Sequence, residues 1–127
     1  MIEDEAMPLL GYKKQFVPLV ESWEKRQTIR AIRKRPFKVG DRLYHYFGLR
    51  TKSCRKLLES DCTAADDILI DEKGDVYING EMLLFTMSKE SLAYADGFRP
   101  AGKAWGQMLH FFKTVHGLPF TGQLVKW

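Results

Sequence analysis

The sequence has few of the features that mark metal-binding, disulfide-bonded or membrane proteins. Its two cysteines, Cys54 and Cys62, are too few for a disulfide framework and form no C-x-x-C pair. No apolar run approaches the ~20 residues that span a bilayer, and the first residues are acidic where a secretory signal is basic. We therefore expect a cytoplasmic protein with no membrane partner.

Common catalytic motifs are also absent from the chain. There is no glycine-rich phosphate loop, no G-x-S-x-G sequence and no H-E-x-x-H sequence. The three histidines, His45, His110 and His116, lack metal-ligand spacing, and we interpret them as surface or hydrogen-bonded core residues. We expect neither a metal nor another cofactor. The oligomeric state is not predicted.

Length and apolar spacing favour one α+β domain over residues 1–127, with residues 1–7 as a flexible tail. A hydrophobic content of 45% is enough for a core. Helical periodicity predicts helices over 17–24, 88–95 and 103–116. Strands are expected over 9–12, 28–32, 43–47, 51–63, 67–71, 76–79 and 120–127. A small mixed β-barrel with about three flanking helices fits this order best.

Positive charge is concentrated in residues 25–40, where no acidic residue occurs, whereas the rest of the chain carries more acidic than basic residues. This density favours a phosphate-binding surface for RNA or a nucleotide over a merely solvated loop. The aromatic Tyr44 follows and offers a stacking surface for a base, although strand aromatics are more often core. The basic residues are Lys25, Arg26, Arg30, Arg33, Lys34, Arg35 and Lys38.

Lys25 and Thr28 form a second feature of this segment. Thr28 and Arg30 are two residues apart, so on a strand their side chains share a face. Lys25 is three residues before Thr28, which on one strand places the two on opposite faces. The two can therefore act together only if Lys25 lies in the turn before the strand. As a general base, Lys25 needs its pKa lowered by ~3 units, and burial beside Arg26 and Arg30 acts in that direction. From composition alone, an ordinary strand threonine beside a surface lysine is the better interpretation, because threonine is common in strands.

The segment Trp23-Glu24-Lys25-Arg26-Gln27-Thr28-Ile29-Arg30 resembles the G-x-K-x-x-[E or T]-x-R motif of the ASCH domain family. It matches at Lys25, Thr28 and Arg30 and departs at Trp23, where the family usually has glycine. Segments 15–18, 38–41, 96–98, 105–112 and 119–127 resemble further family features in the same order. The likeness runs from about residue 9 to residue 127 and points to a small bacterial or phage-type member.

This resemblance implies a PUA-like β-barrel with a ligand cleft beside the first helix. The first hypothesis is an RNA- or nucleotide-binding domain with a basic cleft around residues 25–30 and, at its edge, Arg33, Lys34 and Arg35. The second is an amidohydrolase that deacetylates acetylated cytidine, as in one branch of the family. In that case Thr28 is the nucleophile, Lys25 its base and Asp96 the acidic partner, where the branch has glutamate. A ribonuclease using Lys25 and Tyr44 ranks third, and a plain interaction module fourth.

Overall fold

The computed structural model describes residues 7–127, so most of the tail expected at residues 1–7 lies outside the described residues. Along this part of the chain lie three α-helices, one short 3-10 helix and eight strands. In chain order they are β1 (Leu9–Tyr12), η2 (Lys14–Phe16), α1 (Val17–Glu21), β2 (Gln27–Ala31), β3 (Arg42–Phe47), β4 (Arg55–Asp61), β5 (Ala64–Ile70), β6 (Val76–Ile78), β7 (Glu81–Met82), α2 (Thr86–Ala95), α3 (Ala104–Val115) and β8 (Phe120–Lys126).

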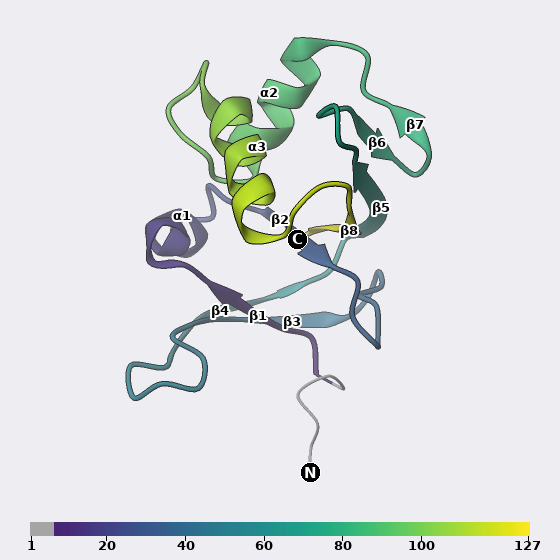
Figure 1. Cartoon of the computed structure of the whole chain (residues 1–127). Coiled ribbons are helices and arrows are strands. Elements are labelled where there is room, and N and C mark those ends of the chain that lie inside the picture. Colours follow the sequence, from purple (N-terminus) through teal and green to yellow (C-terminus); the bar gives the residue numbers. More distant parts are fainter. Residues whose placement is uncertain (1–6) are drawn as a thin grey trace.

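The strands of residues 7–127 form two separate sheets. One has the order β1-β3-β4 and the other the order β2-β8-β5-β6-β7. Figure 1 shows α2 and α3 lying above β2 and β8, with the three-stranded sheet below. The expected α+β class with three helices is confirmed. The expected closed barrel is not formed by the described strands, because no hydrogen-bonded ladder joins the two sheets.

The strand expected over residues 51–63 was wrong at its start. Residues 48–54 form turns instead, and β4 begins only at Arg55. The Thr51 amide and hydroxyl both donate to the Gly48 carbonyl, and the Ser53 amide donates to the Thr51 hydroxyl. These local bonds give the backbone an alternative to the sheet ladder, and threonine and serine side chains favour such turns.

Helix α3 packs an apolar face against the core, as its periodicity predicted. Ala104, Met108 and Phe112 are buried at helical spacing, whereas Val115 in the last turn is half exposed. No helix within residues 7–127 combines the length and apolar character needed to cross a membrane.

Candidate functional site

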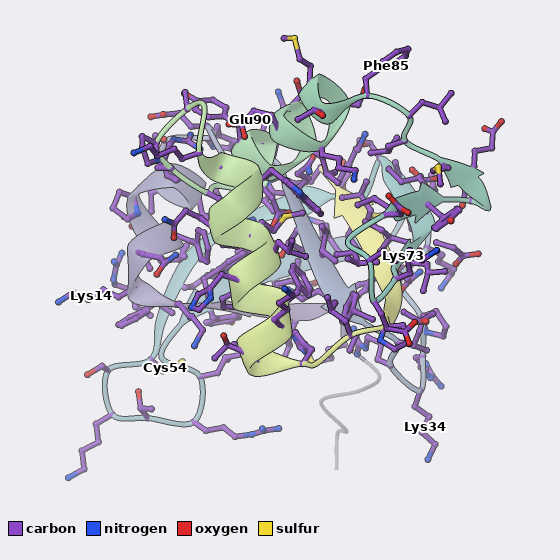
Figure 2. The ribbon with its side chains drawn as sticks, turned by 45° about the horizontal axis from the view of Figure 1, so that its top comes forward. Lys14, Lys34, Cys54, Lys73, Phe85 and Glu90 are labelled. Carbon is purple, nitrogen blue, oxygen red and sulfur yellow. The ribbon has the colours of Figure 1, made fainter. Side chains whose placement is uncertain are left out.

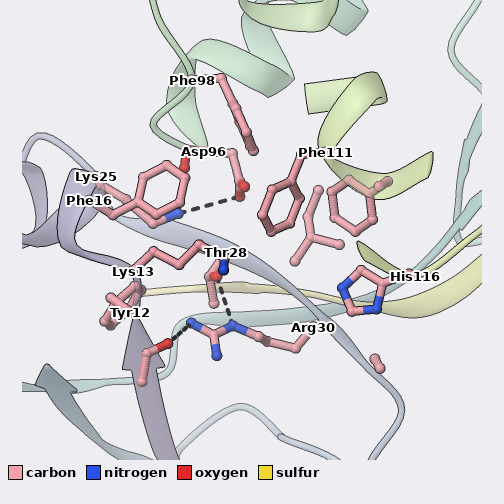
Figure 3. A pocket seen from close by; sticks show the side chains of 14 residues that line it. Tyr12, Lys13, Phe16, Lys25, Thr28, Arg30, Asp96, Phe98, Phe111 and His116 are labelled. Atoms are coloured by element: carbon pink, nitrogen blue, oxygen red, sulfur yellow. Dashed lines mark hydrogen bonds and ion pairs between the residues drawn. The ribbon is translucent and has the colours of Figure 1, made fainter. Parts of the chain in front are cut away.

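A pocket of about 190 Å³ lies between the end of β1, strand β2 with the turn before it, the residues after α2, and α3. Figure 3 shows the side chains of these segments facing one another across it. Segments that are far apart in the sequence therefore contribute to one site. The lining residues are Gly11, Tyr12, Lys13, Phe16, Lys25, Thr28, Ile29, Arg30, Ala31, Asp96, Phe98, Phe111, Phe112 and His116.

Lys25 reaches this pocket from the turn between α1 and β2, which is the placement required for it to act with Thr28. Its amide donates to the Leu19 carbonyl at 2.9 Å, which folds the chain back after the short helix. Trp23, in the middle of the turn, adopts a left-handed backbone conformation with φ of 67°. The ASCH motif, which this segment resembles, has glycine at this position, and glycine adopts that conformation without steric cost.

Substitutions at Trp23 test this explanation. Trp23→Gly is expected to change the free energy of unfolding by less than about 1 kcal/mol, because relief of the left-handed strain offsets the entropy of glycine and the loss of the Arg26 contact. Trp23→Val is expected to lower it by about 1–2 kcal/mol, since a β-branched residue tolerates positive φ poorly. Urea unfolding of both variants measures the difference; equal stabilities would remove the backbone explanation.

The Lys25 ammonium is buried among carbonyl oxygens, a carboxylate and two aromatic rings. Its Nζ donates to the Gln27 carbonyl at 2.6 Å and to the Asp96 carbonyl at 2.5 Å, and lies 3.7 Å from Asp96 Oδ1. The Phe16 ring centroid is 5.1 Å away. Burial lowers the pKa of Lys25 to about 8, against the opposing charge of Asp96. A neutral amine has two N–H groups and one lone pair, so two carbonyl acceptors leave that lone pair free.

Asp96 lies in the residues that follow α2 and is 5% exposed. Burial raises its pKa to about 6, although Lys25 and Arg30 act in the opposite direction. Its Oδ1 atom is buried and has no hydrogen-bond partner within the described part of the chain. A buried carboxylate oxygen without a donor is costly, and such groups are often found at functional sites.

Gly97 lets the backbone next to Asp96 pack closely against Phe16 and Lys25. It has φ of 105°, and a Cβ there would lie 2.8 Å from the Phe16 ring and 3.2 Å from the Lys25 side chain. We expect Gly97→Ala to lower the free energy of unfolding by about 2–4 kcal/mol, from strain at positive φ and from overpacking. The control is Gly102→Ala, where φ is 87° but the space is open, so only the backbone term applies. Equal losses in thermal unfolding would show that close packing at Gly97 is unimportant.

Thr28 is buried on β2 and its hydroxyl is oriented by Arg30. Arg30 Nε donates to Thr28 Oγ1 at 3.0 Å, and its Nη2 donates to the Gly11 carbonyl at 2.7 Å. Figure 3 shows Thr28 between the Lys25–Asp96 pair and Arg30. Because Thr28 Oγ1 accepts from a cation, its own proton remains available to another acceptor, and negative charge on the oxygen is favoured.

A buried chain of hydrogen bonds lies beside Arg30, and the sequence analysis did not predict it. The Arg30 guanidinium lies 5.0 Å from the centroid of the Tyr12 ring. The Tyr12 hydroxyl is 2.8 Å from His45 Nδ1, and His45 Nε2 is 2.7 Å from Ser60 Oγ. Burial lowers the pKa of His45 to about 4 and raises that of Tyr12, so both are neutral at pH 7. Neutral His45 has one donor and one acceptor nitrogen, so it accepts a hydrogen bond from one of these two hydroxyls and donates to the other.

An aromatic wall closes the other side of the pocket. Phe16 and Phe98 contact edge-to-face with centroids 5.4 Å apart, and Phe111 lies 5.7 Å from Phe98. His116, from the end of α3, stacks on Phe112 at 5.4 Å. These rings could be assigned to the pocket only once the packing of α3 was known, because their spacing in the sequence also suits a core.

The other predicted binding residues lie away from the pocket. Arg26 is exposed and donates to the Trp127 carbonyl at 3.1 Å. Arg33 donates to the Met7 carbonyl, and Lys34 projects into solvent at the edge of the molecule in Figure 2. Neither these residues nor Arg35 and Tyr44 line the pocket. The structure thus gathers Lys25, Thr28, Arg30 and Asp96, and separates them from the rest of the basic segment.

Comparisons with known proteins found no match to this chain among family models, curated proteins or solved structures.

Proposed function

We propose that the protein hydrolyses an amide on a small heterocyclic substrate, with acetylated cytidine as the compound that the ASCH resemblance implies. The observation that carries this proposal is the grouping of Thr28, Lys25 and Asp96 in one confined pocket, with the pKa of Lys25 lowered to about 8. A hydroxyl that shares a pocket with an amine partly neutral near pH 7 can be activated as a nucleophile by that amine. The proposal also includes a PUA-like fold for this chain, which the ASCH resemblance implies.

In the first half of the reaction Thr28 is acylated. The Lys25 amine takes the hydroxyl proton while Thr28 Oγ1 attacks the carbonyl carbon of the substrate amide. The guanidinium of Arg30, already hydrogen-bonded to Thr28, supplies positive charge beside the developing negative charge. The tetrahedral intermediate then collapses, the C–N bond breaks, and the Lys25 ammonium returns the proton to the leaving nitrogen.

The second half releases the acyl group. Lys25, neutral again, takes a proton from water as the water oxygen attacks the ester carbonyl on Thr28. The Thr28 oxygen leaves and regains a proton from Lys25, and a carboxylic acid is released. Asp96 stabilises the Lys25 ammonium each time it forms, because its carboxylate lies 3.7 Å from Nζ.

The geometry supports this hydrolase more than it supports an RNA groove or a ribonuclease. The pocket is small, and Arg33, Lys34 and Arg35, which an RNA groove would require, do not line it. Tyr44 lies on β3 outside the pocket, so the acid–base pair of a ribonuclease is not assembled with Lys25. RNA binding by the exposed part of the basic segment stays a separate prediction, and strong weakening of binding by salt would support it.

The test is hydrolysis of N4-acetylcytidine by the purified protein, followed by chromatography. We expect one equivalent each of cytidine and acetate. A fluorescently labelled single-stranded RNA is titrated in parallel. Absence of turnover by folded protein, with tight and salt-dependent RNA binding, would reverse the order of the two hypotheses.

A further inference from the structure

Lys13 is a cation at the mouth of the pocket that the reaction above does not use. It follows β1 and precedes η2, is exposed, and yet lines the pocket. Its Nζ lies 5.9 Å from the centroid of the Phe111 ring, which belongs to α3 on the opposite wall. Figure 3 shows Lys13 among the side chains that line the pocket. The ammonium therefore lies across the mouth and does not point away from it.

No carboxylate within residues 7–127 forms an ion pair with Lys13. Asp96 is the one carboxylate among the lining residues, and it is buried beside Lys25. The rest of the lining adds the positive charge of Arg30, five uncharged aromatic rings, and His116, whose pKa is lowered by burial. The entrance thus presents a cation that nothing in the described chain neutralises.

The size of the pocket determines what part of a ligand meets this cation. Its volume of about 190 Å³ is below the ~300–1,000 Å³ of pockets that enclose drug-sized ligands. A heterocycle with its acyl group would occupy the interior near Thr28 and the aromatic wall. The remainder of a nucleoside-sized compound would then lie at the mouth, within reach of Lys13.

We propose that Lys13 binds a phosphate group of the substrate, so that the preferred substrate is an N-acylated nucleotide and not the free nucleoside. This inference rests on the proposed function for the identity of the heterocycle. The phosphate contact itself needs no chemistry at Thr28. Lysine suits this role because its ammonium attracts phosphate as a compact point charge.

The experiment is calorimetric titration with cytidine, cytidine 5′-monophosphate and, as a base-free probe, phenyl phosphate. Wild type, Lys13→Gln and Lys14→Gln are compared at about 20 mM and about 300 mM salt. Lys14 is a matched control, because it is the next residue, is exposed, and does not line the pocket. Figure 2 shows it projecting from the edge of the molecule.

We expect wild type to bind the monophosphate roughly five- to tenfold more tightly than cytidine at low salt, with a smaller ratio at high salt. Lys13→Gln should bring that ratio close to one, while Lys14→Gln should leave it unchanged. A ratio near one in wild type, or an unchanged ratio in Lys13→Gln, overturns the proposal, as does failure of both phosphate compounds to bind.

Turnover separates this outcome from failure of the proposed function. A Lys13-dependent preference for phosphate without hydrolysis of acetylated cytidine or its monophosphate would reject the hydrolase and keep the phosphate site. Hydrolysis of both compounds with equal kcat/KM would keep the hydrolase and reject the phosphate site. A trinucleotide with the acetylated base in the middle, if bound more tightly than the monophosphate through Lys13, would assign the phosphate to an RNA chain.

Discussion

Thr28→Val is expected to lower kcat for hydrolysis of acetylated cytidine by at least about a thousandfold, because valine has nearly the shape of threonine but no nucleophilic oxygen. The Arg30 Nε–H loses its acceptor on Thr28, at a cost to the free energy of unfolding of about 1–2 kcal/mol. Turnover is measured by chromatography, and the fold by circular dichroism and urea unfolding.

Thr28→Ser is the matched variant. It keeps the hydroxyl and removes only a methyl group, so we expect it to retain activity within about a hundredfold of wild type. Mass spectrometry of the quenched reaction should show an acyl adduct on wild type and on Thr28→Ser, and none on Thr28→Val. Turnover by Thr28→Val at more than a tenth of the wild-type rate would exclude Thr28 as the nucleophile.

The second large effect concerns the protonation of Lys25. Only the neutral amine accepts a proton, and burial sets the pKa of Lys25 at about 8, so kcat/KM should rise with pH and level off above about 8. Lys25→Arg keeps a cation that does not deprotonate in this range, and we expect activity to fall by about 10²–10⁴-fold at every pH tested. A pH profile of the two proteins between pH 5 and pH 10, using single-turnover rates, measures both effects.

Asp96→Asn tests the direction of the coupling between the two groups. The charge of Asp96 raises the pKa of Lys25, so its removal should lower that pKa further and move the rising limb of the profile to lower pH. The control is Glu24→Gln, because Glu24 is next to Lys25 in sequence but is exposed and bonded to Ser22. Two results would contradict the assignment of Lys25 as the base. One is a rising part of the pH profile that moves to higher pH in Asp96→Asn, and the other is an equal shift in Glu24→Gln.

Several elements could be predicted from local sequence because their determinants lie within one element. The apolar spacing of residues 103–116 predicted α3 almost to its ends, since burial at every third or fourth position is a property of one helix. Strand β7 was not predicted, because its two residues, Glu81 and Met82, are too few to show the alternation of apolar and polar residues typical of a strand. The turn at residues 48–54 was missed since Cys54 and Leu57 were interpreted as part of one continuous strand.

The four residues at the centre of the site were named from the sequence, but for different reasons. Lys25, Thr28 and Arg30 lie within six residues, so a short motif includes them all. Asp96 is far away in the chain and was named only through the family resemblance. The pairing of Lys25 with Asp96 at 3.7 Å depends on the packing of the residues after α2 against the turn before β2. No local pattern contains that information.

By itself, the sequence determined the α+β class, the position of the longest helix and the concentration of positive charge in residues 25–40. Tertiary structure alone decided which of those charges are buried in a pocket and which are solvated. It also decided the placement of Tyr12, His45 and Ser60 in one hydrogen-bond chain, since these residues lie on three strands, β1, β3 and β4. The physical reason is that a lowered lysine pKa is produced by desolvation, and desolvation depends on everything that packs around the amine.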